Sequence, residues 1–281
     1  MPRRRPSAIL LALLVPLILL AAACGGDDDG GGGGSTLQKI KDRDKLVVGI
    51  KYDQPGFGLR TASGDFEGFD VEIAKLLAKE LVGDASKVEF KETPSKIREQ
   101  AIIDGDVDLV IATYTINDER KEKISFAGPY YEAGQDIMVK ADDDSIKSVK
   151  DLNGKKVCSV TGSTSIDNIK DEAPDADISR PFDTYSKCAE ELKNGRVDAV
   201  TTDNSILYGL ADQDKGAFRV LGKPFTEEPY GIGVKKGDDE MRDRVNDFLK
   251  KIEGNGEWQK AYAATVGQIR PGKVEPPAIE P

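Results

Sequence analysis

The sequence has 281 residues, enough for two domains of ordinary size or one large domain. Apolar residues make up 38% and charged residues 32%, as in a soluble globular protein, and the net charge of −10 argues against nucleic acid as a partner. The chain has no histidine, which removes the commonest metal ligand and the commonest general base at neutral pH.

A basic and then apolar segment begins the chain. Arg3, Arg4 and Arg5 precede an apolar run, Ala8 to Ala23, that is short for a membrane span of about 20 residues and fits a secretory signal peptide. The run ends in LLAAAC, which resembles the lipobox of bacterial lipoproteins, where the cysteine is acylated. This resemblance implies a lipoprotein signal peptide over 1–23 and lipidation of Cys24. The alternative is an ordinary signal peptide with Cys24 incidental.

The segment that follows, 24–36, is rich in glycine and aspartate and has almost no apolar side chain to bury. Such a composition cannot support a packed fold, so it is typical of a tether that holds a domain away from a membrane.

The strands predicted for the body of the chain occur in two similar units. KLVVGIKYD (45–53) begins the first unit and KKVCSVTGS (155–163) begins the second. GDVDLVIAT (105–113) and GRVDAVTTD (195–203) repeat glycine, valine and aspartate in register, and each follows a helical segment. Alternating strands and helices predict an α/β protein with two lobes of similar plan and mostly parallel sheets.

Two helices are predicted near the C-terminus. Met241, Val245, Phe248, Leu249 and Ile252 form the apolar stripe of the first, and Trp258 and Tyr262 anchor the second. The proline-rich segment 271–281 is predicted to be a disordered tail.

Cys158 and Cys188 remain once Cys24 is assigned to the lipid anchor. An even pair in an exported protein predicts a disulfide, and two buried free thiols are the alternative.

Polar side chains occur where the buried strands end. In open α/β sheets ligands bind beyond the carboxyl ends of the strands, where Thr113, Thr115 and Asp203 are expected to lie. GSTS (162–165), with Ser163 and Thr164, occupies the same place in the second unit, and its backbone N–H groups suit an anion. Arg120 offers a planar fork for a carboxylate. One cation, one anion and several hydroxyls match a zwitterionic amino acid, although each residue taken alone is equally typical of a surface charge, a helix cap or a loop.

Six motifs resemble the family 3 solute-binding proteins of bacterial ABC transporters, which bind polar amino acids. They are FEGFDVEIAKLLAKEL, GDVDLVIATYTINDERKEKISFAGPYY, DLNGKKVCSVTGSTS, GRVDAVTTD, PYGIGVKKGD and GNGEWQKAY. KYDQPGFGLR and the cysteine pair resemble the glutamate- and glutamine-binding lipoproteins of actinobacteria in particular.

The resemblance implies a two-lobed Venus-flytrap fold of the type II periplasmic binding protein kind, with two crossing hinge strands. Lobe 1 would comprise 37–131 and 229–270, and lobe 2 would comprise 132–228. The protein would be a monomer without a cofactor, lipid-anchored on the outer face of the cell membrane, and would work with permease and ATPase subunits of an ABC importer.

The resemblance also implies site roles. Arg120 would hold the ligand α-carboxylate, aided by Thr115 and the backbone at Thr164, and Asp203 with Thr113 would hold the α-ammonium. An aromatic residue of the first loop, Phe57 or Tyr52, would contact the ligand.

The expected ligand is glutamate or aspartate, with glutamine or asparagine next. In a strongly negative protein a side-chain carboxylate needs a further cation, for which Arg60 is the first candidate and Lys96 the second, each with a surface charge as the alternative.

Two other functions compete with transport. A cleft enzyme of the same fold, such as a dehydratase, needs a general acid, for which Glu227 and Glu228 are the only suggestive pair; a solvated hinge turn is the alternative. A sensor ectodomain would need a membrane span and a cytoplasmic module, and neither is found in the sequence.

Overall fold

The computed structural model describes residues 35–178, 180–270, 272 and 274–279. The predicted signal peptide, Cys24 and nearly all of the predicted tether lie outside these residues. Ser35, at the end of the predicted tether, caps the first helix by accepting a hydrogen bond from the backbone N–H of Gln38.

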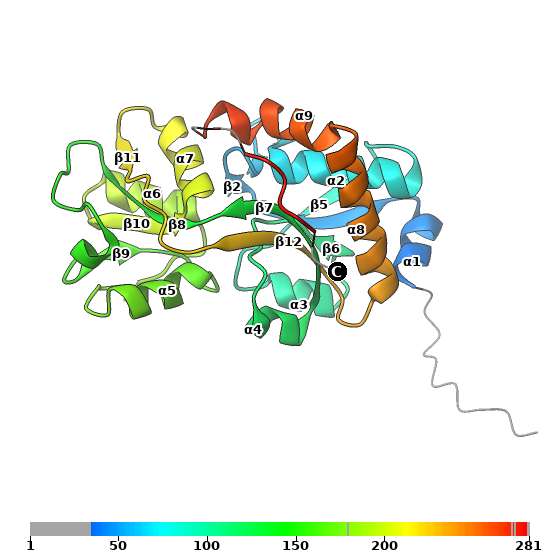
Figure 1. The fold of residues 1–281 in the computed structure, drawn as a ribbon, viewed down its shortest axis with the longest axis horizontal. Helices are drawn as coiled ribbons and strands as arrows, with labels where there is room; N and C mark the ends of the chain where they lie inside the picture. Colours follow the sequence, from blue (N-terminus) through cyan, green and yellow to red (C-terminus); the bar gives the residue numbers. More distant parts are fainter. Residues whose placement is uncertain (1–34, 179, 271, 273, 280–281) are drawn as a thin grey trace, which may run out of the picture. The chain divides into compact units, whose positions relative to one another are not determined.

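The first sheet has the strand order β5-β1-β6-β12-β7 (Figure 1). Strand β1 pairs in parallel with β5 and β6, whereas β12 pairs antiparallel with β6 and β7. The strands are β1 (Leu46–Ile50), β5 (Val88–Glu92), β6 (Leu109–Val110), β7 (Ser125–Ala133) and β12 (Glu228–Val234). We call this sheet with its helices the first lobe.

The helices of the first lobe bury the stripes that the sequence predicts. Ile73 and Leu77 share one apolar core with Val245, Leu249 and the ring of Trp258. The helices are α1 (Thr36–Arg43), α2 (Phe69–Val82), α3 (Arg98–Ile103), α4 (Asp118–Lys123), α8 (Asp239–Gly254), α9 (Glu257–Ala264) and the 3₁₀ turn η2 (Val266–Gln268). The two predicted C-terminal helices are therefore confirmed as α8 and α9.

The second sheet has the order β11-β8-β10-β9 and forms the second lobe with its own helices. Strands β9 and β10 are parallel, and β8 runs antiparallel to β10 and β11. The elements are β8 (Gln135–Lys140), η1 (Val149–Leu152), β9 (Val157–Cys158), α5 (Thr164–Glu172), α6 (Tyr185–Lys193), β10 (Ala199–Asp203), α7 (Asn204–Gln213) and β11 (Phe218–Val220).

The α/β class and the two-lobed plan are confirmed, but the sheets are less parallel than predicted. The antiparallel pairs involve β7, β8, β11 and β12, and the chain crosses between the lobes where β7 leads into β8 and where β12 begins. The two crossings run side by side: Gln135 N donates to Thr226 Oγ1 at 3.0 Å, and a Cβ at Gly134 would lie 2.5 Å from the carbonyl oxygen of Thr226. The residue limits of the lobes stay a prediction.

The repeated Gly-x-Val-Asp motif has the same structural role in both lobes. Gly105 and Gly195 adopt φ of 75° and 69° after α3 and α6, a conformation that favours glycine. Asp108 Oδ2 then accepts a hydrogen bond from Val47 N at 2.7 Å, and Asp198 Oδ2 accepts one from Lys156 N at 2.8 Å. Each aspartate thus ties its strand to the chain at the start of a neighbouring strand.

A disulfide joins β9 to α6 in the second lobe, which confirms the predicted pairing. The Cα atoms of Cys158 and Cys188 lie 5.5 Å apart, and 30 residues separate them in sequence. On the chain-entropy account, closing a loop of this length stabilises the fold by roughly 3–4 kcal/mol.

Two further segments differ from what their sequences suggest. The loop after β1 contains a small sheet of β2 (Asp53–Gln54), β3 (Gly58–Arg60) and β4 (Phe66–Glu67). In the C-terminal segment expected to be disordered, Val274 and Ile279 are half-buried against the core of the first lobe, because their apolar side chains find a partner there.

Candidate functional site

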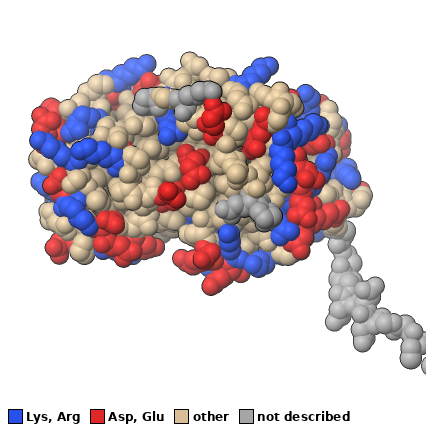
Figure 2. All heavy atoms as spheres, in the orientation of Figure 1, with Lys and Arg blue, Asp and Glu red and all other residues tan. Residues whose placement is uncertain are grey.

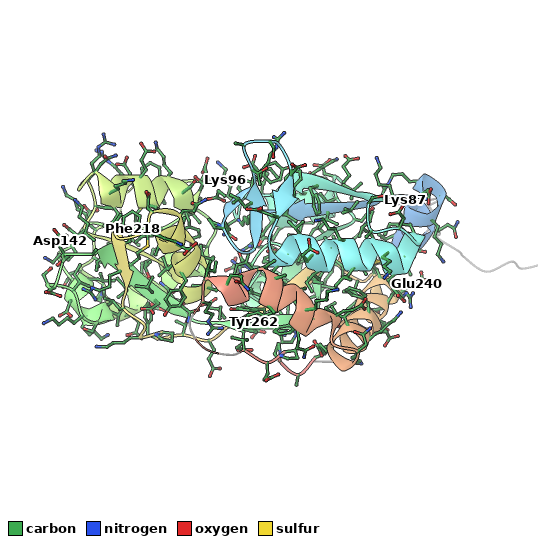
Figure 3. The ribbon with its side chains drawn as sticks, turned by 90° about the horizontal axis from the view of Figure 1, so that it is seen from above. Lys87, Lys96, Asp142, Phe218, Glu240 and Tyr262 are labelled. Atoms are coloured by element: carbon green, nitrogen blue, oxygen red, sulfur yellow. A yellow bond between two sulfur atoms is a disulfide. The ribbon has the colours of Figure 1, made fainter. Side chains whose placement is uncertain are left out.

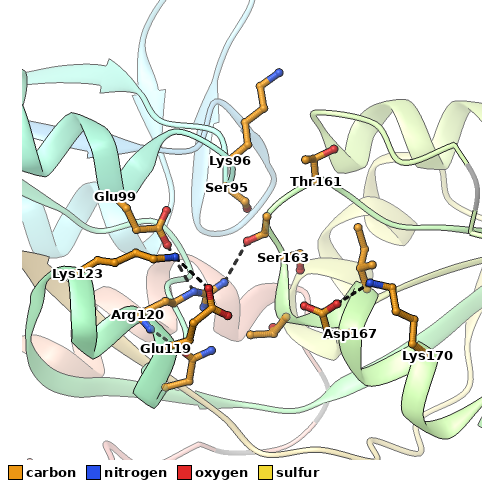
Figure 4. A pocket seen from close by; sticks show the side chains of 14 residues that line it. Ser95, Lys96, Glu99, Glu119, Arg120, Lys123, Thr161, Ser163, Asp167 and Lys170 are labelled. Atoms are coloured by element: carbon orange, nitrogen blue, oxygen red, sulfur yellow. Dashed lines mark hydrogen bonds and ion pairs between the residues drawn. The ribbon is translucent and has the colours of Figure 1, made fainter.

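A cavity of about 400 Å³ lies where residues of both lobes meet (Figure 4). The first lobe lines it with the segment before and at the start of α3 and with α4. The second lobe lines it with the loop that follows β9 and with α5. Figure 4 shows Arg120 and Glu99 on one side and Ser163 and Asp167 on the other.

Arg120 joins the two lobes at this cavity. It lies in α4, which begins after Asn117 because that side chain accepts a hydrogen bond from Arg120 N. The guanidinium is buried; its Nη1 donates to Thr115 O at 2.8 Å and its Nη2 donates to Gly162 O at 3.1 Å. Glu99 Oε1 lies 3.7 Å from Nε. A charged fork held by carbonyl oxygens of both lobes is well placed to bind a carboxylate between them.

Thr113 follows β6 in an uncommon conformation. Its φ is 45°, a left-handed value that is rare and costly for a β-branched residue. Buried partners hold it there: its backbone N donates to Asp70 Oδ2 at 3.1 Å and its hydroxyl donates to Gln54 Oε1 at 2.9 Å. Burial raises the pKa of Asp70 to about 6. Backbone strain held by buried polar groups is common at binding sites.

Asp203 is a buried carboxylate at the end of β10. Its Oδ2 accepts a hydrogen bond from Tyr230 at 2.5 Å, whereas its Oδ1 is buried without a hydrogen-bond partner among the described residues. Burial, with a further contribution from the nearby Glu228, raises the pKa of Asp203 to about 7. A half-satisfied carboxylate of this kind is suited to an ammonium group.

The loop after β9 is fixed by side-chain hydrogen bonds. Ser163 caps α5 and accepts a hydrogen bond from the hydroxyl of Tyr185 at 2.8 Å. Thr164 Oγ1 donates to Glu228 Oε2 at 3.1 Å. These hydrogen bonds hold the loop beside Arg120, which donates to Gly162 O.

The expectation of a solvated hinge turn at Glu227 and Glu228 is wrong for Glu228. Glu227 is exposed, but Glu228 is buried and also accepts hydrogen bonds from Asn168 and Thr226. These donors come from α5 and from the crossing that leads into β12, and they compensate for burying the carboxylate.

The structure brings together only part of the predicted site. The cavity is lined by Arg120, Ser163, Thr164 and Lys96. Thr115 does not line it, but its carbonyl oxygen accepts a hydrogen bond from Arg120. Thr113 and Asp203 are buried and do not line it. Burial raises the pKa of Asp203, and the positive charge of Arg120 offsets part of this rise. The two charges therefore interact across the lobes.

The aromatic candidates of the first loop do not line this cavity. Phe57 is buried in a cluster of rings with Tyr131 and Tyr230, at centroid distances of 5.2 and 5.8 Å. Tyr52 is half-buried against Phe66.

The two candidate side-chain cations lie apart from each other. The guanidinium carbon of Arg60 lies over the rings of Tyr52 and Phe66, 5.8 and 5.9 Å from their centroids, and Arg60 does not line the cavity. Lys96, which Figure 3 shows between the two lobes, lines the cavity. Its Nζ pairs with Asp183 of the second lobe at 2.7 Å.

The sequence reasoning missed two buried cations near the cavity. Lys51 follows β1 directly and Arg98 begins α3; both are buried. The rule that singled out Thr113, a polar residue at the end of a buried strand, also applies to Lys51 and could have found it.

The sequence matches the model of the bacterial extracellular solute-binding proteins, family 3, over residues 46–268. It is 47% identical to the ABC transporter glutamine-binding protein GlnH of Bacillus subtilis, over 81% of this chain and 83% of that relative. It is 41% identical to the glutamate-binding protein GluB of Corynebacterium efficiens, over 81% of this chain and 80% of GluB. A similar solved structure is that of the ancestral amino acid-binding protein AncCDT-1, a precursor of cyclohexadienyl dehydratase. It is 38% identical to this chain and superposes with a TM-score of 0.76, over 83% of this chain and 100% of AncCDT-1.

Proposed function

The chain belongs to family 3 of the bacterial extracellular solute-binding proteins, and from this we propose that it delivers an acidic amino acid to an ABC importer. The observation that carries the proposal is the pair of buried, opposite charges, Arg120 in α4 of the first lobe and Asp203 at the end of β10 in the second. Opposite charges fixed on two lobes match the carboxylate and the ammonium of one amino acid.

Each end of the ligand has its own set of partners in this proposal. Arg120 binds the α-carboxylate, with Thr115 and the backbone at Ser163 and Thr164 as further donors. Asp203 binds the α-ammonium with Oδ1, aided by Thr113. Binding the ligand then draws the two lobes together, because each lobe holds only one of its charges.

Glutamate or aspartate is the proposed ligand, with glutamine or asparagine next. The named relatives are a glutamine-binding and a glutamate-binding protein, which supports a ligand of this size and polarity and leaves its charge open. Three buried cations near the cavity, Lys51, Arg98 and Arg120, favour the acidic choice.

Calorimetry of residues 35–281 against the twenty amino acids tests this function. We expect glutamate or aspartate to bind at least about tenfold more tightly than glutamine, a difference of about 1.4 kcal/mol. If glutamine binds tenfold more tightly than glutamate, the acidic assignment is wrong. If no amino acid binds, the function itself is wrong.

Ligand binding is expected to close the two lobes about the crossings rather than to refold either of them. The measurement is small-angle X-ray scattering with and without saturating glutamate. A smaller radius of gyration supports closure, and an unchanged one contradicts it. Glutamate should also raise the melting temperature, since it binds only the folded protein.

Membership of this family implies export, and we propose that a lipid on Cys24 retains the protein as a monomer at the outer face of the membrane. There it would contact the permease of an importer that also has ATPase subunits. In the part of the chain that the structure describes, no helix combines the length and apolar character needed to cross a membrane.

Acidic and basic side chains are intermixed on the face shown in Figure 2, without the continuous basic stripe typical of nucleic-acid binding.

A dehydratase is the second candidate, since AncCDT-1 is described as a precursor of one. Such an enzyme needs a general acid, and Glu228 is the buried candidate for it. Its carboxylate oxygens, however, already accept hydrogen bonds from Thr164, Asn168 and Thr226. We therefore assign it to anchoring the crossings, and we propose that the protein is not an enzyme. Turnover of a cyclohexadienyl acid by the purified protein would favour the enzyme instead.

A further inference from the structure

Tyr230 contacts residues at both ends of the proposed site. It lies in β12, and an isolated antiparallel bridge pairs its backbone with Thr115, whose carbonyl oxygen accepts a hydrogen bond from Arg120. Its hydroxyl donates to Asp203 Oδ2 of the second lobe at 2.5 Å. One buried residue of the first sheet therefore links the segment that holds Arg120 to the carboxylate at the end of β10.

The side chain of Tyr230 is held on several sides. Its buried ring stacks on the ring of Tyr131, with 5.5 Å between the centroids and an interplanar angle of 26°, and meets the ring of Phe57 edge-on at 5.8 Å. Ser205 Oγ lies 3.0 Å from the Tyr230 hydroxyl, so it can donate to Tyr230 while Tyr230 donates to Asp203. The packing and this second hydrogen bond direct the hydroxyl proton towards the carboxylate.

A second buried pair of tyrosine and aspartate, in the first lobe, shows what is different at Asp203. Tyr130 donates to Asp70 Oδ1 at 2.6 Å, and Thr113 N donates to Asp70 Oδ2 at 3.1 Å, so both oxygens of Asp70 have donors. Asp203 has a donor on Oδ2, but its buried Oδ1 has no hydrogen-bond partner among the described residues. Tyr230 thus fixes one oxygen of Asp203 and leaves the other for a further donor.

We propose that Tyr230 is a positioning residue, which holds the carboxylate of Asp203 so that Oδ1 meets the α-ammonium of the ligand. This inference rests on the proposed function, in which Asp203 binds that ammonium. Tyr230 acts through Asp203, and no contact with the ligand is assigned to it. Its hydrogen bond also favours the ionised carboxylate, because a hydroxyl donates more strongly to a charged oxygen than to a neutral one.

Several charged groups act on the same carboxylate. Burial raises the pKa of Asp203 to about 7, and the negative charge of Glu228 contributes to this rise. The hydrogen bond from Tyr230 lowers the pKa of Asp203, as do the positive charges of Arg120 and Arg98. Each of these groups comes from a different element, so the effect of Tyr230 can be removed alone.

Removing only the Tyr230 hydroxyl should therefore raise the pKa of Asp203, so that more of this carboxylate is protonated at neutral pH. Tyr131 and Tyr185 also interact with Asp203. Burial raises the pKa of each of these hydroxyls above its usual value, so both stay neutral in this range and do not obscure the effect.

Calorimetry of Tyr230→Phe with glutamate and with glutamine tests the proposal, because phenylalanine keeps the ring and removes only the hydroxyl. At neutral pH we expect both ligands to bind about tenfold more weakly, and by the same factor, since they share the α-ammonium. Titrations in two buffers of different ionisation enthalpy also give the number of protons released. At about pH 7 the wild type should release about half a proton, and the variant more, because more of Asp203 is protonated before binding.

Tyr131→Phe is the matched control. It removes a hydroxyl from the ring that stacks on Tyr230, but that hydroxyl accepts a hydrogen bond from Arg270 Nη1 at 3.0 Å and has no part in holding Asp203. We expect it to leave both affinities and the proton release unchanged. Melting curves report whether each variant is folded.

Ser205→Ala is the second variant, and it decides the proposal if Tyr230→Phe does not fold. It removes the group that donates to the Tyr230 hydroxyl and so weakens the hydrogen bond from Tyr230 to Asp203. We expect it to change the affinity and the proton release in the same directions as Tyr230→Phe, each by less. Wild-type values for both quantities would contradict the proposal.

The other outcomes for Tyr230→Phe are equally decisive. If it binds both amino acids as tightly as the wild type, Tyr230 does not position Asp203. If binding weakens while the proton release stays at the wild-type value, Tyr230 contributes packing alone, and the proposal is overturned. Unequal losses for glutamate and glutamine would also overturn it, because they would place Tyr230 beside the side chain of the ligand. None of these results touches the proposed function, which fails only if the wild-type protein binds no amino acid.

Discussion

Replacing Arg120 by alanine is expected to remove amino-acid binding almost completely. The substitution leaves the α-carboxylate in a desolvated place without its partner, which costs roughly 2–5 kcal/mol or more, a loss of about 30-fold at the least. It also removes the hydrogen bonds from Arg120 to Thr115 O and Gly162 O, and with them a contact between the lobes. Titration calorimetry with glutamate and with glutamine measures the loss.

Lys121→Ala is the matched control for this experiment. Lys121 is the next residue of α4, carries the same charge and is exposed. Its removal is expected to leave both affinities within about threefold, because exposed charges contribute little. Melting curves of the two variants show whether either substitution disturbs the fold. A loss of less than tenfold in Arg120→Ala would remove Arg120 from the site.

Binding is expected to strengthen as the pH rises towards neutrality and then to level off. The pKa of Asp203 is raised to about 7, and only its ionised form can bind an ammonium group. Below that value the ionised fraction falls about tenfold per pH unit, so the affinity falls with it and binding releases a proton. Measuring the dissociation constant for glutamate from about pH 5 to about pH 8 tests this expectation.

The Asp203→Asn variant identifies the titrating group. It is expected to bind glutamate about 100-fold more weakly at neutral pH and to lose this part of the pH dependence. Asp70, with a pKa of about 6, also titrates in this range, and any dependence that survives in the variant is assigned to it. Equal affinities at both ends of the pH range in the wild type would exclude Asp203 as the ammonium partner.

The same shift has the opposite effect on the unliganded fold. Because the pKa of Asp203 is higher in the folded than in the unfolded chain, the folded state binds more protons between about pH 4 and pH 7. This group therefore favours the fold at low pH and disfavours it as the pH rises through about 7. Ligand binding should cancel that loss by supplying a positive charge.

The positions of site residues that lie at or just after the end of a strand could be predicted from the sequence. Asp203 ends a buried strand, and Thr113 follows the equivalent strand of the other repeated unit. A repeat fixes where two strand ends lie without any knowledge of side-chain contacts. Arg120 was a candidate because its planar fork suits a carboxylate, and the resemblance to a known family gave it a specific role. The cysteine pair could also be predicted, since an exported chain with two remaining cysteines has one pairing.

The residues around the side chain of the ligand could not be predicted in the same way. Arg60 and Phe57 follow the first strand at a distance that suits a ligand contact. Phe57 instead packs on Tyr131 and Tyr230, which lie far away in the sequence, and Arg60 stacks on Tyr52 and Phe66. Which of several polar residues in a loop points into a cavity depends on these long-range contacts.

The sequence by itself determined the α/β class, the repeated helix–glycine–strand units and the disulfide pair, because each follows from local composition, periodicity or count. Only the tertiary structure decided that Glu228 is a buried anchor and that Lys51 is buried close to Arg98 and Arg120. The physical reason is that burial of a charge depends on which distant groups surround it: Thr164 and Asn168 come to Glu228 from the second lobe, and Arg98 and Arg120 come to Lys51 from separate helices.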